Sequence, residues 1–171
     1  MTAALIIILS FTSYAFVILA MFRLFKINYF NPIVKIFATY LEPVSKSIFF
    51  FLNPLLAASA LALLLQFISF YLAFSAGQEP LVLFYMSVGR VLESFFGILY
   101  YCVIGSVILS WVAPGNNHPL LQIVEEMSDG ILNPIRRLLP PMGGLDFTPI
   151  IGIILLINIQ RFFTQIISSM A

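Results

Sequence analysis

Long apolar stretches without a charged residue dominate this chain. They cover Ala3–Phe22, Ile48–Gln78 and Ser94–Ala113. A helix of about 20 residues, rising about 1.5 Å per residue, crosses the roughly 30 Å of hydrocarbon in a bilayer. Each stretch is therefore long enough to form a transmembrane helix.

A fourth apolar stretch, Pro149–Ser169, carries one charge, Arg161, near its middle. A central arginine costs about 2.5 to 3.5 kcal/mol of insertion free energy, whereas each isoleucine, leucine or phenylalanine contributes roughly 0.3 to 0.6 kcal/mol. The many isoleucines of this stretch outweigh the arginine, so the pattern predicts a fourth span.

The composition supports a membrane protein. Of the 171 residues, 61% are hydrophobic and 9% are charged, and the mean hydropathy is +1.07. That is too apolar for an ordinary soluble domain of this length. The start of the chain lacks the basic residues and cleavage site of a signal peptide, so we interpret it as a retained helix. No basic patch combines with exposed aromatic residues, and we expect no nucleic-acid partner.

Basic residues predict the orientation of the spans, because positively charged connections stay in the cytoplasm. The first connection carries Arg23, Lys26, Lys35 and Lys46, and the third carries Arg136 and Arg137. The second connection has only Arg90. The first and third connections are therefore expected to be cytoplasmic. This predicts a multi-pass protein of the inner or plasma membrane with both termini on the non-cytoplasmic side.

The sequence also indicates two tandem copies of one unit. A shift of 87 positions places Pro32 on Pro119 and Pro54 on Pro141, and both halves have the order span, proline-containing basic connection, span. We predict repeats at residues 1–86 and 87–171. Two spans per copy give both copies the same orientation. The predicted fold is an all-α membrane protein with four transmembrane helices arranged as two parallel two-helix repeats.

Both basic connections have an amphipathic helical pattern, which predicts that they lie in the membrane interface. Their apolar stripes are Ile33, Ile36, Phe37, Tyr40 and Val44 in the first, and Leu120, Ile123, Val124, Met127, Ile131, Ile135, Leu138 and Leu139 in the second. We expect Gly130 and Pro134 to break or kink the second segment. Thr148 is expected to cap the fourth span, with Pro149 at its first position.

The segment from Pro134 to Pro149 has the most specific pattern. It contains a Pro-hydrophobic-Arg-Arg-hydrophobic-hydrophobic-Pro run, then Gly-Gly, an acidic residue and Thr-Pro. The residues are Pro134, Arg136, Arg137, Pro140, Gly143, Gly144, Asp146, Thr148 and Pro149. Here the chain resembles the YggT family of small integral membrane proteins. The first copy has Phe49, Phe50, Ala57 and Ser59 at the places of Arg136, Arg137, Gly144 and Asp146, so we expect only the second copy to use this motif.

The resemblance implies a membrane factor linked to envelope, division or osmotic physiology in bacteria, with plastid relatives linked to cytochrome assembly or organelle organisation. It implies no reaction common to the family. The sequence itself has no nucleophile with a base at a known spacing and no phosphate-binding glycine loop. We therefore expect a protein that is not an enzyme.

Three residues of the motif are candidates for binding, and each has a structural alternative. Arg136 and Arg137 either bind anionic lipid headgroups or a partner, at about 1 kcal/mol per basic residue, or only anchor the topology. Asp146 either pairs with one of these arginines or caps the fourth span. The prolines and the glycine pair of the motif are expected to shape the turn back into the bilayer.

A polar stripe marks the fourth span. Asn158, Arg161 and Gln165, followed by Ser169, fall on one face of the helix. The stripe either lines a path for ions or small solutes or packs against other helices, with Arg161 reaching toward Glu93.

Lone residues limit other chemistry. Cys102 is the only cysteine, and with Ser106 and Ser110 it forms a small-residue stripe suited to close helix packing. His118 is the only histidine, which excludes a multi-histidine metal site. A role as haem ligand has no support beyond the plastid relatives, and we interpret His118 as a polar interfacial residue. We expect no cofactor and no metal.

These observations favour a non-enzymatic assembly or organising factor of the cell envelope. Its cytoplasmic segments would bind membrane lipids, a membrane-protein partner or a second copy of the chain. The alternative is a small transporter or channel subunit that uses the stripe on the fourth span. A bundle of four helices leaves little room for an internal aqueous path, which ranks transport second.

Overall fold

A computed structural model describes residues 2–74, 77–112, 115, 117–139 and 146–170 of the chain. Within these residues the chain forms helices and no strands, so the predicted all-α fold is confirmed. The helices are α1 (Thr2–Leu24), α2 (Pro32–Tyr40), α3 (Glu42–Ile48), α4 (Pro54–Ala73), α5 (Pro80–Val112), α6 (Pro119–Leu138) and α7 (Thr148–Met170).

Four helices, α1, α4, α5 and α7, are long and apolar enough to cross a membrane. The four predicted spans are thus confirmed, and the chain is a multi-pass membrane protein. Two boundaries differ from the expectation. The second span begins only at Pro54, because Oδ1 of Asn53 accepts a hydrogen bond from the amide of Leu56 at 2.9 Å and caps α4 there.

The third span is much longer than its charge-free stretch. Helix α5 has 33 residues, and Arg90 and Glu93 lie inside it, so the assignment of Arg90 to the preceding connection was wrong. The helix continues through both residues because they stand one turn apart and pair, with Nη1 of Arg90 2.8 Å from Oε2 of Glu93.

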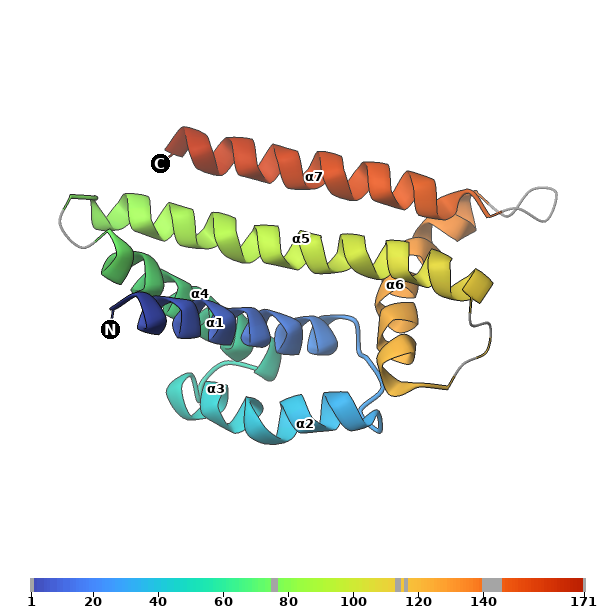
Figure 1. The fold of residues 1–171 in the computed structure, drawn as a ribbon, viewed down its shortest axis with the longest axis horizontal. Helices are drawn as coiled ribbons and strands as arrows, with labels where there is room; N and C mark the ends of the chain where they lie inside the picture. Colours follow the sequence, from blue (N-terminus) through green and yellow to red (C-terminus); the bar gives the residue numbers. More distant parts are fainter. Residues whose placement is uncertain (1, 75–76, 113–114, 116, 140–145, 171) are drawn as a thin grey trace.

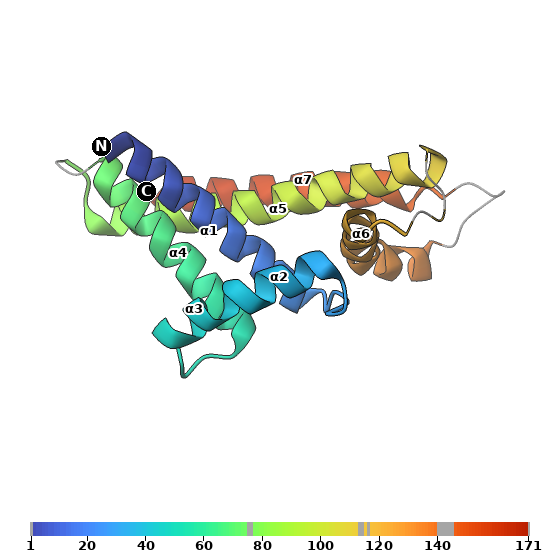
Figure 2. The ribbon, with the colours of Figure 1, turned by 60° about the horizontal axis from the view of Figure 1, so that its bottom comes forward.

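The spans form two pairs. Helix α1 packs most extensively against α4, and α5 against α7, and Figures 1 and 2 show the first pair inclined to the second. Helices α1 and α5 run in one direction, and α4 and α7 in the other (Figure 1). This order agrees with two parallel units, although the repeat itself and its boundaries stay a prediction.

Both termini lie toward one end of the bundle, which we call the termini end, and α2 and α6 lie toward the other, the connection end (Figures 1 and 2). Helix α3 follows α2 and packs against α4. The buried core draws residues from α1, α4, α5 and α6. Its members include Phe16, Leu19, Leu61, Val103 and Met127. Helix α7 contributes Leu156 to this core and leaves most of its apolar side chains exposed, as expected for a helix that faces lipid.

The first part of helix α6 runs across the bundle, transverse to α5 and α7 (Figures 1 and 2). Its apolar residues Ile123, Met127 and Leu132 are buried, and it packs mainly against α5 and also against α7. The apolar stripe that suggested contact with lipid therefore packs largely against the protein. The interfacial depth of the connections stays a prediction.

The expected break in α6 was wrong, because the helix continues through Gly130 and Pro134 to Leu138. The alternative, a kink, agrees with Figures 1 and 2, in which the last part of α6 runs in a different direction from the first. A proline ring clashes with the carbonyl group four residues earlier, which here belongs to Gly130, the residue type whose backbone adapts most readily. Packing also holds this part of the helix. A Cβ atom on Gly130 would lie 2.3 Å from Cδ1 of Phe25, so the ring of Phe25 rests directly on the backbone of α6.

Candidate functional site

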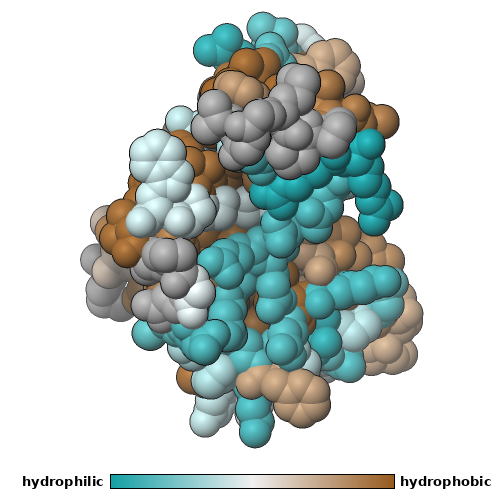
Figure 3. All heavy atoms as spheres, turned by 90° about the vertical axis from the view of Figure 1, so that its right-hand side faces the viewer, coloured by the Kyte–Doolittle hydropathy of each residue, from teal (hydrophilic) through white to brown (hydrophobic). Residues whose placement is uncertain are grey.

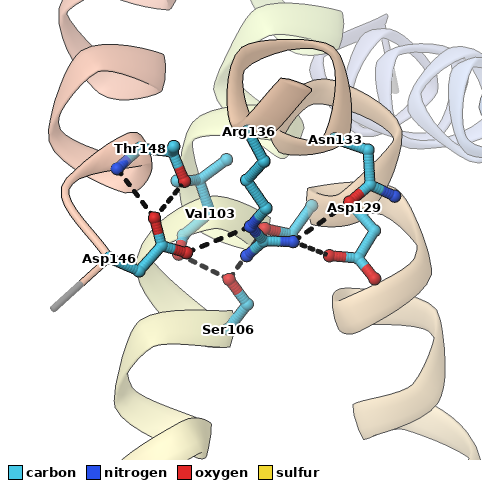
Figure 4. A network of polar contacts seen from close by, with 8 residues as sticks. Val103, Ser106, Asp129, Asn133, Arg136, Asp146 and Thr148 are labelled. Carbon is cyan, nitrogen blue, oxygen red and sulfur yellow. Dashed lines mark hydrogen bonds and ion pairs between the residues drawn. The ribbon is translucent and has the colours of Figure 1, made fainter. Parts of the chain in front are cut away.

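The polar residues of the motif meet where α6 ends and α7 begins (Figure 4). Nη1 of Arg136 donates to Oδ1 of Asp129 at 2.7 Å and to Oδ1 of Asn133 at 3.2 Å. Nε of the same guanidinium donates to Oδ2 of Asp146 at 3.0 Å. Asp129, Asn133 and Arg136 lie on one face of α6, because they are spaced by four and three residues. We call this group, with Asp146, the Arg136 cluster.

Asp146 fulfils both roles that the sequence left open. Its Oδ2 pairs with Arg136, and its Oδ1 accepts hydrogen bonds from the amide of Thr148 at 2.9 Å and from Oγ1 of Thr148 at 2.5 Å. The acceptor at the start of α7 is therefore Asp146, and the expectation that Thr148 caps the helix was wrong. Pro149 is the second residue of α7 and not the first, because the helix begins at Thr148.

The electrostatics keep the Arg136 cluster charged. Burial would raise the pKa of Asp146, but hydrogen bonds from Thr148 and the nearby Arg136 outweigh it, so this pKa lies below its usual value. Burial would lower the pKa of Arg136, but the carboxylates of Asp129 and Asp146 outweigh it and raise this pKa. The cluster joins α6 to the start of α7 through ion pairs that persist at neutral pH.

A second set of contacts fastens α6 to α5. Oγ of Ser106 and Oγ of Ser128 are 2.7 Å apart, and Sγ of Cys102 is 3.7 Å from Sδ of Met127. The packing role predicted for Cys102 and Ser106 is confirmed, because α6 lies against both. Ser110 is exposed.

The two motif arginines have different environments. Arg136 is partly buried and paired with two carboxylates, whereas Arg137 is exposed and makes no ion pair with any residue that the structure describes. Pro134 lies within α6 and not in a turn. Pro140, Gly143 and Gly144, to which the sequence also assigned the turn, lie outside the described residues.

The two connections contact each other, which the sequence did not indicate. Asn31 caps α2, because its Oδ1 accepts from the amide of Ile33 at 3.0 Å, and its Nδ2 donates to the carbonyl oxygen of Pro119 at 2.7 Å. Oε2 of Glu126 accepts from the amide of Asn28 at 2.8 Å. His118 has a capping role: its Nδ1 accepts from the amide of Leu120 at 3.3 Å.

The polar stripe of the fourth span faces outward. Asn158, Arg161 and Gln165 are all exposed, and Nδ2 of Asn158 bonds within its own helix, to the carbonyl oxygen of Ile154 at 2.7 Å. Glu93 pairs with Arg90 instead of Arg161, so the proposed contact between Arg161 and Glu93 was wrong. Arg90 stands one turn from Glu93 on the same helix, so the carboxylate of Glu93 already has an ion-pair partner.

The comparisons with known proteins agree with this structure. The CCB3/YggT family model matches residues 85–167, and the uncharacterized protein PA0392 of Pseudomonas aeruginosa is 33% identical over 167 residues, covering 91% of this chain and 85% of that protein. The chain belongs to the CCB3/YggT family. The family model extends from within α5 through α6 into α7, so it includes the whole Arg136 cluster.

Other similar proteins carry the family name or resemble the chain over most of its length. The uncharacterized protein YggT of Escherichia coli K12 is 28% identical over 147 residues, 83% of this chain and 77% of that protein. An uncharacterized protein of Haemophilus influenzae is 27% identical over 165 residues, 95% of this chain and 91% of that protein. No solved structure matches this CCB3/YggT protein.

Proposed function

We propose that this CCB3/YggT protein is a non-enzymatic organising factor of the cell envelope, active in division, osmotic or membrane-complex homeostasis. Its connection end faces the cytoplasm and binds anionic lipid headgroups. The same end binds a membrane-protein partner, either through these lipids or directly. The observation that carries the proposal is the division of the basic residues at this end into internal and outward-facing groups.

The internal group builds the connection end. Arg136 holds Asp129 and Asp146. Glu42, at the start of α3, pairs with Arg23 at the end of α1 and, at 3.0 Å, with Lys46. These pairs tie the short helices to the spans, and they leave these three cations engaged within the protein. A rigid surface suits a binding role, because less conformational entropy is lost when a ligand or partner docks.

The outward-facing group supports lipid binding. Lys26, Lys35 and Arg137 are exposed, and the structure gives them no ion pair with any residue it describes. They come from the segment after α1, from α2 and from the last turn of α6, and Figure 3 shows hydrophilic residues spread across the end of the molecule that carries α6. Each basic residue near an anionic bilayer surface contributes about 1 kcal/mol of attraction.

Thermal unfolding of the purified full-length protein tests this assignment. In phosphatidylcholine nanodiscs, replacing part of the lipid with phosphatidylglycerol should raise the Tm of the unaltered chain. The triple variant Lys26→Gln, Lys35→Gln, Arg137→Gln should lose most of that rise, while Arg161→Gln, which also removes an exposed cation, should keep it. A rise that survives in the triple variant would refute lipid binding by these residues.

A partner is tested in cells with a photo-crosslinking amino acid at position 137. Exposed Arg137 is replaced without disturbing the Arg136 cluster, and a crosslinker at Gln165 on the outer face of α7 is the matched control. We expect a discrete crosslinked protein from position 137. Crosslinks to lipid alone would restrict the proposal to lipid binding, and crosslinks from Gln165 to the same chain would indicate a second copy.

The second candidate function is that of a small transporter or channel subunit, and the exposure of Asn158, Arg161 and Gln165 favours it. Polar side chains that face outward at membrane depth need a partner, so a path along this stripe would form between copies of the chain. Potassium flux into liposomes tests this function. Flux that is lost in Arg161→Leu would support it, and flux no greater than in empty liposomes would exclude it.

A further inference from the structure

A groove of about 610 Å³ lies inside the membrane-spanning part of the bundle, between the α1–α4 pair and the α5–α7 pair. Its polar lining comes from all four spans and includes Ser10, Ser13, Gln66, Arg90, Glu93 and Gln160. Polar groups that converge from several elements on one hollow are typical of a ligand site. This groove is separate from the Arg136 cluster and from the outward stripe of α7.

The groove lies at membrane depth. Gln66 and Gln160 stand near the middle of α4 and α7, and both helices are of a length that matches the hydrocarbon thickness. Arg90 and Glu93 line the groove beside them. Ionisable residues at this depth are costly and are typical of functional sites.

Gln66 gives the strongest sign that the groove holds a ligand. Its side chain is 4% exposed, and it makes no hydrogen bond with any residue that the structure describes. The neighbouring serines are satisfied, since Oγ of Ser13 donates to the carbonyl oxygen of Ala62 at 2.7 Å and Ser10 bonds to Ser69 at 2.9 Å. Among the described residues, every fully buried side-chain nitrogen or oxygen has a hydrogen-bond partner, so the unpartnered amide of Gln66 reaches the surface of the groove that it lines. A molecule bound in the groove would satisfy this amide.

The Arg90–Glu93 pair defines the chemistry of that molecule. The two side chains contact each other at 2.8 Å and still expose 57% and 53% of their surfaces. A guanidinium binds phosphate through paired hydrogen bonds, and the adjacent carboxylate accepts hydrogen bonds from an ammonium group. The two charges cancel, so the groove suits a ligand that itself carries one charge of each sign.

Access is from the termini end. A second hollow of about 620 Å³ shares Glu93 and Gln160 with the groove and extends to Gln78 and Ser168, which follow α4 and approach the end of α7. In the opposite direction the bundle is filled by buried Phe16, Leu99 and Val103. The two hollows thus form a polar recess that is open toward one side of the membrane and closed by the core toward the other.

We propose that this recess binds a phosphate-and-ammonium zwitterion, with the phosphate on Arg90, the ammonium on Glu93 and further hydrogen bonds to the amides of Gln66 and Gln160. Two sources have this chemistry: the headgroup of phosphatidylethanolamine, entering from the bilayer, and a free phosphoethanolamine compound, entering from the aqueous side. The assignment is independent of lipid binding at the connection end.

The test uses the full-length protein in phosphatidylglycerol nanodiscs. One arm replaces part of the lipid with phosphatidylethanolamine, and the other adds free glycerophosphoethanolamine. We expect a Tm rise of several degrees in at least one arm. A rise with the lipid alone assigns a headgroup, a rise with the free compound assigns a solute, and no rise in either arm overturns the proposal.

Matched variants separate binding in the recess from a general effect of the lipid. Gln66→Leu keeps the side-chain volume and removes the unpartnered amide, so it should fold and should lose the ligand-dependent rise. Glu93→Gln should lose it as well, because the ammonium partner is gone. Gln165→Leu, on the outer face of α7, should keep it. An equal rise in Gln66→Leu and the unaltered chain would overturn the proposal even where the lipid stabilises both.

Discussion

The side chain of Asn31 joins the two connections of the chain, because its Nδ2 donates a 2.7 Å hydrogen bond to the carbonyl oxygen of Pro119 while its Oδ1 caps α2. The residue that starts one connecting helix therefore also holds the first residue of the other. Asn31 is 3% exposed, so water does not readily replace either bond.

Substitutions at Asn31 should separate these two roles. Asn31→Ser keeps a good capping residue but is too short to reach Pro119, and we expect a loss of about 1 kcal/mol of unfolding free energy. Asn31→Ala loses both the cap and the link, and the expected loss is about 2 kcal/mol. Thermal unfolding in detergent measures both variants. No loss in Asn31→Ser would contradict a contribution from the link, and equal losses in the two variants would contradict one from the cap.

Arg136 and Asp146 should show energetic coupling that disappears in acid. Both side chains are about one third exposed, so we expect a coupling of roughly 0.5 to 1 kcal/mol at neutral pH. A double-mutant cycle with Arg136→Gln and Asp146→Asn measures this coupling.

The pH dependence follows from the direction of the Asp146 pKa. This pKa is lower in the folded protein than in the unfolded chain, so the stabilisation is complete above the unfolded value of about 4 and is lost as pH falls through the folded value. Asp146→Asn should therefore be destabilising at pH 7, and its cost should shrink as the pH falls below about 4. A coupling that stays constant over this range would show that the carboxylate charge is not responsible.

A methyl group at Gly130 should disrupt the packing of α6. A Cβ atom there would lie 2.3 Å and 2.8 Å from ring atoms of Phe25, and we expect Gly130→Ala to destabilise the fold by about 1 to 3 kcal/mol. Gly97→Ala is the matched control, since a Cβ atom on Gly97 meets no atom within 4 Å. This control should be neutral or stabilising by up to about 1 kcal/mol, because alanine favours a helix.

Local signals explain what the sequence could predict. Three charge-free stretches and a fourth with the single charge of Arg161 revealed the four spans, and the short spacing between Asp146 and the start of α7 indicated a cap. The pairing of Asp129 with Arg136 was within reach, because residues seven apart lie on one face of a helix.

The features that the sequence misplaced or missed depend on contacts between distant residues or on exceptions to the rule that charged residues end a span. Helix α5 was cut short because Arg90 and Glu93 end a charge-free stretch, although together they form a neutral pair that the helix tolerates. The link from Asn31 to Pro119 joins residues far apart in the chain, and no periodicity encodes it. The recess around Gln66 exists only because four spans bring their polar residues to one place.

The orientation of the bundle gives the last prediction. In a Cys102→Ser background, Lys35→Cys reports on the connection end and Gln78→Cys on the termini end, since both native residues are exposed. The positive-inside rule predicts that a membrane-impermeant maleimide labels Gln78→Cys in intact cells and labels Lys35→Cys only after the membrane is opened. The reverse pattern would place Lys26, Lys35 and Arg137 on the non-cytoplasmic side and would turn the recess around Gln66 toward the cytoplasm.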